Sequence, residues 1–553
     1  MKRYLLIVLL LVLIPLTVKG QDDQTIVIRG FGNITNFNPI LANDGASYQA
    51  YSLLWPLPFE TDSFTGEPVP GLTTWTVSED GLTYTFTIRD DAVWSDGTPI
   101  TSNDMKWVID AVQSDAVESV LKPNAELIES VNIIDDKTYE IVLAETNCAA
   151  LSDIGAFRFL PSHRFAADFS DVETNEITTN PDISGGPYIL EEWRPDEFQR
   201  FVANPTYWEG EPNIPVLINR VIGEQAVAIQ ALQAGEIDYT YLQGDLFQQL
   251  TNTENLQYEA FPQITVNFFS MNWADPTNPQ AAYDEDGNPV EQTPHPIFSD
   301  VRVRQAVAMG YNKQDILDTL GENGGTRLIG VVAPSVTWAY HADLEPWPYD
   351  PEAAAALLEE AGWVDSDGDG VREKDGQRLA FTINYSDILL FFETTALVIQ
   401  DQLGQIGFEV TLNKQEWANY LEETYFGQMY DATPMSNSGG TGGPPDPNEF
   451  TSLLLSTQDV PGGGGNNLAS YVNPEVDELI NQGRSVPGCG LEERAEIYRQ
   501  IQQITHDDVA YDWTFTPNLY QIMNRRIGNF NPGPTWVFYG YTAHVEEWTI
   551  EGE

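Results

Sequence analysis

Alternation of apolar and polar residues predicts β-strands in several parts of the chain. The segments TIVIRGF (25–31), TYTFTIRDDAVW (83–94) and TYEIVLAET (138–146) place apolar side chains at every second position. This spacing is typical of strands that bury one face. No fixed-period repeat and no long low-complexity tract interrupts the pattern, which argues against solenoid architectures.

Other segments carry apolar residues at helical spacing between clear start and stop signals. In DPEAAAALLEEAGW, Asp350 is placed to cap a helix, Pro351 suits its first turn and Gly362 ends it. The segment 473–484 opens with Asn and Pro in the same way. Because strands and helices alternate irregularly, the sequence predicts a mixed α/β fold. Possible seams between lobes lie where Pro and Gly gather, at 56–70, 180–186, 272–296 and 460–467.

The N-terminus has the pattern of a secretory signal peptide. Lys2 and Arg3 precede an apolar run from Tyr4 to Val18, and Gly20 precedes the expected cleavage point. The run is too short for a stable membrane anchor. We therefore expect residues 1–20 to be removed and the mature chain to be extracytoplasmic, either periplasmic or secreted. No cysteine near the cleavage point could accept a lipid.

Charge excludes one class of function. The 553 residues include 83 acids and 26 bases, a formal net charge of −57, so the surface repels nucleic acid and anionic headgroups. We interpret the excess as a solvated acidic surface, with attraction of cationic solutes as the alternative. About 530 residues remain after the signal peptide, which at typical domain sizes predicts two to four lobes, and a composition of 42% hydrophobic residues agrees with a core in each.

The two cysteines, Cys148 and Cys489, are far apart in sequence. In an oxidising compartment they could form a disulfide that closes a very long loop. Two separate buried thiols are the alternative, and the sequence does not decide between them.

Enzyme motifs are missing from the sequence. It contains no GxSxG elbow, no HExxH and no GxxxxGK loop. The five histidines have no ligand-like spacing, and among 83 acids a catalytic carboxylate pair cannot be singled out. We therefore expect no enzymatic activity and no cofactor, with a secreted hydrolase as the alternative from another class and a calcium-stabilised adhesion module as a third.

One segment, DSDGDGVREKDG (365–376), resembles a calcium loop. Asp365, Asp367 and Asp369 alternate as the first ligands of such a loop do, and Gly370 permits its turn. The twelfth position is Gly376, where a bidentate Glu is needed. We interpret the segment as a polar turn and keep an opportunistic Ca²⁺ site as the alternative.

Several stretches resemble one family in its own order. LTYTFTIRDDAVWSDGTPITSNDMKWVIDAV (82–112) is similar to the signature of extracytoplasmic solute-binding protein family 5, the peptide and nickel receptors of ABC importers. GGPYILEEWRPDEFQRFVANPTYWEG (185–210) and IFSDVRVRQAVAMGYNKQDIL (297–317) resemble further family segments, as do the two helices described above, within YDPEAAAALLEEAGW and NLASYVNPEVDELINQGR.

The resemblance implies a type II periplasmic-binding-protein fold, in which two α/β lobes joined by a hinge enclose a solute. It implies that lobe I comprises 21–57, 184–270 and 514–553, that an extra subdomain comprises 58–183, and that lobe II comprises 271–513. We expect a monomer that delivers its solute to the transmembrane subunits of an ABC permease. Trp94, in the W-x-D-G turn, is interpreted as structural.

The stretch GGTGGPPDPNEF (439–450) corresponds by resemblance to a loop that reaches the ligand. Glycines allow close approach of the main chain to a ligand, so Gly440, Thr441 and Gly443 are candidate contacts, together with Asp446. Peptide-binding members usually place an Asp, which receives the ligand's amine, where this chain has Gly443. An amine without that partner would lose a charge-assisted hydrogen bond. Either Asp446 or Glu449 replaces it, or the ligand has no free amine there.

Four further residues are candidate ligand contacts by resemblance. Asn36 belongs to a lobe I edge of the cleft, Phe268 lies before the lobe crossing, and Trp513 and Phe515 precede the return to lobe I. The leading function is an ABC-importer receptor for a peptide. An oligosaccharide is the alternative ligand, because Gly443 removes the amine anchor and 14 tryptophans could stack on sugars.

Overall fold

The computed structural model describes residues 24–42, 44–284, 286–438, 443–463, 465–533 and 544–551. The expected signal peptide, 1–20, lies outside this range. Among the helices that the structure describes, none is both long enough and apolar enough to cross a bilayer.

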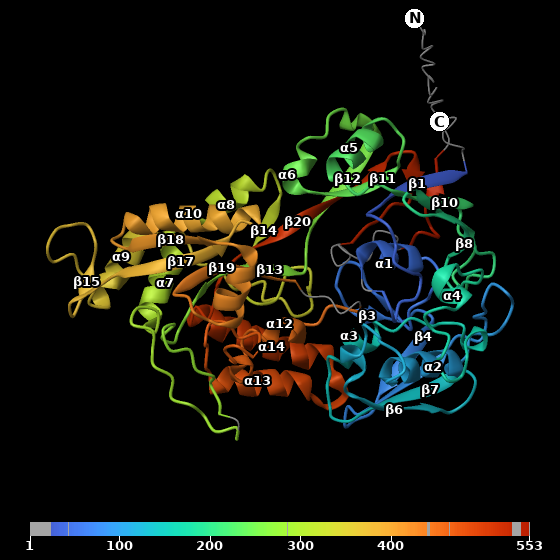
Figure 1. Ribbon diagram of the computed structural model, residues 1–553, viewed down its shortest axis with the longest axis horizontal. Helices are drawn as coiled ribbons and strands as arrows, with labels where there is room; N and C mark the ends of the chain where they lie inside the picture. The colour runs from blue at the N-terminus through green and yellow to red at the C-terminus, as the bar shows by residue number, and fades with distance from the viewer. Residues whose placement is uncertain are drawn as a thin grey trace, which may run out of the picture.

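Strand β20 joins two halves of one large sheet (Figure 1). The strands of the main path follow in the order β18 (Glu409–Gln415), β17 (Ala380–Ser386), β19 (Ala432–Ser438), β13 (Thr265–Met271), β20 (Asp512–Asn524), β11 (Tyr239–Gln243), β1 (Thr25–Gly30), β10 (Val216–Val221), β9 (Phe198–Ala203) and β8 (Tyr188–Arg194). The first part of β20 pairs with β13 and β14 (Gly325–Arg327), and the second part with β11 and β12 (Leu256–Pro262). The chain therefore forms two lobes that share one strand.

Lobe I and the extra subdomain share a hydrophobic core. Ile26 and Leu217 of the lobe I sheet belong to the same buried cluster as Phe86 and Tyr139 of the subdomain. The subdomain contains the sheet β4 (Thr73–Val77), β5 (Thr83–Ile88), β7 (Thr138–Leu143) and β6 (Ile128–Ile133), the pair β2 (Glu60–Thr61) and β3 (Pro68–Val69), and helices α2 (Ser102–Gln113), α3 (Ala150–Ile154) and α4 (Glu176–Thr179). Lobe I adds α1 (Gly45–Tyr51), α5 (Gln225–Gln233), α6 (Gly244–Phe247) and the pair β21 (Ile527–Gly528) and β22 (Thr549–Ile550). A common core makes these two parts one body.

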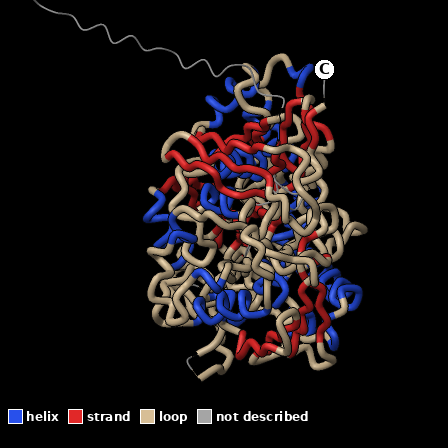
Figure 2. The backbone as a smooth tube through the Cα atoms, turned by 90° about the vertical axis from the view of Figure 1, so that its right-hand side faces the viewer, coloured by secondary structure: helices blue, strands red, loops and turns tan. Residues whose placement is uncertain are grey.

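Lobe II has two core clusters, with Phe269 and Phe515 in one and Phe268 and Trp513 in the other. Its helices are α7 (Val301–Gly310), α8 (Lys313–Thr319), α9 (Pro351–Glu360), α10 (Leu390–Gly404), α11 (Trp417–Asn419), a π-helix (Tyr420–Phe426), α12 (Asn448–Thr451), α13 (Pro474–Arg484) and α14 (Leu491–Asp507), and its small hairpin is β15 (Glu373–Lys374) and β16 (Gln377–Arg378). Long loops connect these elements throughout the molecule (Figure 2).

Local signals in the sequence predict several elements correctly. The Asp350 side chain accepts a hydrogen bond from Ala353 N at 2.9 Å and caps α9, and Asn473 caps α13 in the same way. Strands β1, β5 and β7 lie where alternation predicts them, although β5 ends at Ile88. Trp94 is fully buried, as expected of a structural residue.

Both crossings between the lobes lie a few residues from the expected boundaries. Strand β13 packs in the cores of lobe II, so the first crossing lies between Pro262 and Thr265, before the expected boundary at 270. On β20 the pairing passes from lobe II to lobe I after Pro517, beyond the expected boundary at 513. Alternation indicates that a strand is buried but not which lobe buries it.

Candidate ligand-binding site between the lobes

The chain crosses between the lobes twice, before β13 and along β20, and we call these two strands the crossing strands. Beside them, the main chains of the two lobes approach closely. The Tyr520 hydroxyl donates to the carbonyl oxygen of Glu322 at 2.6 Å, and Asn518 Nδ2 donates to that of Asn323 at 3.0 Å. A Cβ on Gly244 would collide with Gly324, so the turn after α8 fits against α6 only without that atom. These contacts fix the lobes to each other at the crossing.

A second contact joins the lobes away from the crossing strands, and we call it the α3 contact. It consists of residues 147–155 of the extra subdomain and segments 443–449 and 484–489 of lobe II. In Figure 1 α3 lies beside α12 and α14, well below the crossing strands. Cys148 N donates to the carbonyl oxygen of Arg484 at 2.7 Å, and Ser152 Oγ donates to Glu449 Oε1 at 2.7 Å. The lobes therefore meet at two separate places.

A disulfide crosses the α3 contact. Cys148 and Cys489 are bonded, with Cα atoms 5.0 Å apart and a sequence separation of 341. Of the two alternatives that the sequence left open, the structure shows the pairing. The bond connects the extra subdomain to the turn between α13 and α14.

Gly443 contacts the opposite lobe. A Cβ on Gly443 would overlap the carbonyl oxygen of Ser152, and a Cβ on Gly155 would lie 2.7 Å from Cδ of Pro444. The missing side chains thus permit the main chains of the two lobes to touch. The neighbouring candidates Gly440 and Thr441 lie outside the described residues, and their contact with a ligand stays a prediction.

Asp446 forms a buried ion pair. Its Oδ2 lies 2.8 Å from Nη2 of Arg494 on α14, and both side chains are less than a tenth exposed. Burial alone would lower the pKa of Arg494, but the facing Asp446 and Tyr498 raise it. Asp446 also accepts a hydrogen bond from Asn448 N at 2.9 Å. The carboxylate therefore holds the loop against α14, and Glu449 accepts from Ser152.

A cavity of about 190 Å³ lies within the α3 contact and has walls from both lobes. The extra subdomain contributes Trp75 and Tyr84, and lobe II contributes Trp338 and Pro444. Trp75 and Trp338 are half-buried. Aromatic walls of this kind suit a planar or apolar group.

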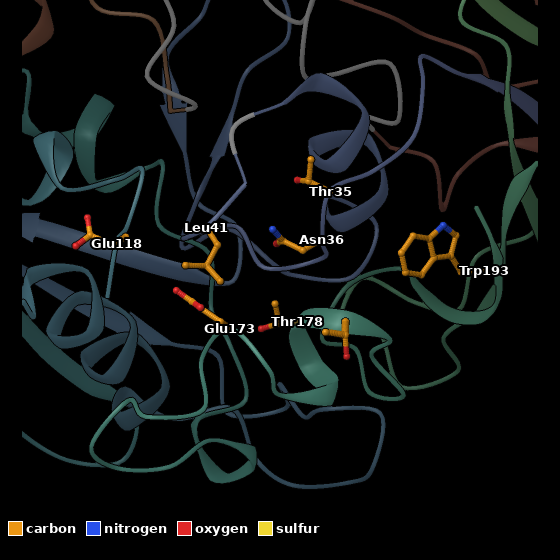
Figure 3. Close-up of a pocket in the computed structure, with 8 residues that line it drawn as sticks. Thr35, Asn36, Leu41, Glu118, Glu173, Thr178 and Trp193 are labelled. Atoms are coloured by element: carbon orange, nitrogen blue, oxygen red, sulfur yellow. The ribbon is translucent and has the colours of Figure 1, made fainter. Parts of the chain in front are cut away.

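Asn36 lines a different cavity, of about 390 Å³, on lobe I and the extra subdomain (Figure 3). Around it lie Leu41, Thr178 and Glu173, with Trp193 on one side. Asn36 Oδ1 accepts a hydrogen bond from Asn38 N at 2.8 Å, which orients its amide. The described residues of this wall belong to one body, so a ligand contact by Asn36 stays a prediction.

The three aromatic candidates lie in the cores of lobe II. Phe268 is 2% exposed and packs edge-on against Trp513, with ring centroids 5.4 Å apart. Phe515 is 1% exposed and packs against Phe391. These contacts position the crossing strands, and ligand contact by the three rings stays a prediction.

The calcium-like loop lies next to β15, far from the crossing strands in Figure 1. Carboxylate oxygens of Asp365, Asp367, Asp369 and Glu373 lie within 4.8 Å of one another. Asp365 accepts hydrogen bonds from two backbone amides of its own turn, and Asp369 pairs with Arg378 at 2.8 Å. The geometry is that of a polar turn, and Ca²⁺ binding stays a prediction.

Three features of the site could not be read from the sequence. Arg494, the partner of Asp446, follows 48 residues later. Ser152 and the Trp75–Trp338 cavity belong to segments that only the tertiary fold brings together.

The model of the bacterial extracellular solute-binding proteins, family 5 (middle region), matches residues 67–462. The chain belongs to this family. It is therefore a substrate-binding protein of an ABC importer and not an enzyme, which removes the hydrolase alternative.

Curated relatives and solved structures extend the match across the chain. The oligopeptide-binding protein AppA of Bacillus subtilis is 24% identical over 96% of this chain and 92% of its own. The dipeptide-binding protein of Escherichia coli is 27% identical over 91% and 92%. The unliganded open form of the murein tripeptide binding protein MppA has a TM-score of 0.78 at 20% identity, over 96% and 98%. The two-lobed α/β fold expected for family 5 is thus confirmed.

Proposed function

We propose that this family 5 protein encloses a peptide between its lobes and delivers it to the transmembrane subunits of an ABC permease outside the cytoplasm. The observation that carries the proposal is the match, over more than nine-tenths of both chains, to proteins named as oligopeptide-binding and dipeptide-binding. A solute enclosed by both lobes favours the closed arrangement by its extra contacts there.

The peptide is held mainly through its main chain. Position 443 carries no side chain, Asp446 is paired with Arg494, and Glu449 accepts from Ser152. None of these three positions therefore offers a carboxylate reserved for the ligand's amine. The contacts that we propose are Asn36 from lobe I and the main chain of Gly440 and Thr441 from lobe II.

The test is calorimetry with a pool of peptides three to nine residues long, in which each peptide is compared with its N-acetylated form. We expect binding of both forms with affinities within a few-fold, because no carboxylate is lost. An amine anchored by a carboxylate would make acetylation cost tenfold or more, since charge-assisted hydrogen bonds contribute about 1.5–3 kcal/mol. That result would show that another acid binds the amine.

An oligosaccharide is the second candidate ligand, and the half-buried Trp75 and Trp338 around the 190 Å³ cavity favour it. Aromatic faces stack on apolar faces of sugars. If cello- or manno-oligosaccharides bind and peptides do not, Trp338→Ala should abolish the binding. The control is Trp417→Ala, since Trp417 is 39% exposed on lobe II and does not line this cavity.

A further inference from the structure

Each lobe has hydrophobic cores of its own, and one covalent bond besides the main chain connects the two bodies. Cys148 belongs to the extra subdomain, which shares its core with lobe I, and Cys489 belongs to the turn before α14 of lobe II. We propose that the Cys148–Cys489 disulfide is a tether that limits how far the lobes separate, and that its reduction by a dithiol releases this limit. The inference rests on the proposed function, because only lobes that part to take up a solute are affected by a tether.

The position of the disulfide makes it effective as a tether. The segment between β12 and β13 and the strand β20 connect the lobes at the crossing, and the disulfide connects them at the α3 contact, below β20 in Figure 1. Two bodies held at two separated points can rotate about the line through both points but cannot part at either. A swing about the crossing strands alone would increase the Cα–Cα distance of 5.0 Å between the cysteines, which a disulfide does not allow beyond about 7 Å.

Besides the disulfide, the extra subdomain and lobe II are held by the close main-chain approaches at Gly443 and Gly155 and by individual hydrogen bonds, one of them from Thr337 Oγ1 to the carbonyl oxygen of Thr65 at 3.1 Å. The α3 contact also contains the hydrogen bonds from Cys148 N to Arg484 and from Ser152 to Glu449. Each such bond contributes little net free energy, because water replaces it in the separated state.

The bond is open to a reductant on one side. Cys148 is 4% exposed, whereas Cys489 is half-buried, and both line the cavity. A thiolate of the dithiol attacks Sγ of Cys489, and Cys148 leaves as a thiolate that takes up a proton. The second thiol of the reductant then attacks the mixed disulfide and releases Cys489. Two electrons and two protons pass to the cysteines, and the reductant becomes a disulfide.

The turn that carries Cys489 has an unfavourable backbone conformation. Cys489 has φ of 54° and follows Gly488 with φ of 70°. The left-handed region is unfavourable for a residue with a Cβ.

The test is small-angle X-ray scattering of the full exported chain, without added solute, after native mass spectrometry has shown that no solute is bound. Three samples are compared: the oxidised chain, the chain reduced with dithiothreitol, and Cys148→Ser/Cys489→Ser. The tether predicts a larger radius of gyration for the reduced chain and the double variant than for the oxidised chain. Ser152→Ala, which loses a hydrogen bond of the α3 contact but keeps the disulfide, should scatter like the oxidised chain.

Equal radii in the three samples would overturn the proposal, and so would two titratable thiols in chain isolated from an oxidising compartment. If the double variant fails to fold, the reduced wild-type chain decides. The measurement needs no ligand, so it separates the two proposals. If the chain expands on reduction but binds no peptide, the peptide proposal is wrong and the tether proposal stands. If it binds peptide but does not expand, the tether proposal is wrong and the peptide proposal stands.

Discussion

At the scale of single residues, the glycine-rich loop shows what a sequence can and cannot reveal. Glycine at 443 predicts close approach of the main chain, and the structure shows one, to Ser152 of the other lobe. The sequence gives no information on what is approached, because the partner lies 291 positions earlier. Likewise Asp446 before a proline is typical of a turn, but its ion pair depends on a helix that follows much later.

Gly443→Ala tests this contact directly. The new Cβ would overlap the Ser152 carbonyl oxygen, so either the loop or α3 must move, at a cost of about 1–3 kcal/mol in the free energy of unfolding. Urea unfolding followed by circular dichroism measures it. Gly404→Ala is the control, because it lies at the end of α10 with no atom within 4 Å of the new Cβ, and an unchanged or higher stability is expected there. Equal stability of the two variants would contradict the close approach.

At the scale of elements, caps and alternation predict helices and strands because their signals are local. Asp350 and Asn473 begin α9 and α13 as expected. The ends of the lobes are less predictable, since β13 and β20 are buried on both faces and could belong to either lobe. The pairing of Cys148 with Cys489 is also non-local, and loop length alone does not predict it.

Helix α14 holds the glycine-rich loop in place through the pair of Arg494 with Asp446. We therefore expect Arg494→Met to reduce the stability of the protein strongly. The change leaves Asp446 as a buried carboxylate without its cation, and removal of one partner from a buried pair costs about 3–5 kcal/mol. Arg499→Met is the matched control on the same helix, because Arg499 is half-buried and pairs with an exposed Glu496, so less than about 1 kcal/mol is expected. Thermal melting compares the stability of the two variants. A similar loss of stability in both would contradict the prediction, because the buried pair would then stabilise the fold no more than the exposed pair does.

At the scale of the whole molecule, the net charge of −57 and several buried or half-buried acids both make the folded state more stable at lower pH. Burial, with a smaller contribution from nearby Glu209, raises the pKa of Glu60 to about 7. Burial raises the pKa of Asp153 to about 7 against a hydrogen bond from Asn124, and burial raises that of Asp459 to about 6. The composition alone predicts repulsion among acids, but not which carboxyls the fold buries.

These shifts predict that the protein is more stable in mild acid than at pH 8. Each group has a higher pKa when folded than when unfolded, so the folded state binds more protons between about pH 4 and pH 7. Stability is therefore gained as the pH falls through 7 and lost as it rises again. The melting temperature should increase from pH 8 to pH 5.5. Asp153→Asn should reduce this increase, whereas Asp90→Asn, at an exposed position of the same subdomain, should leave it unchanged. A melting temperature that falls over this range would show that the buried acids are ionised in the folded protein without cost.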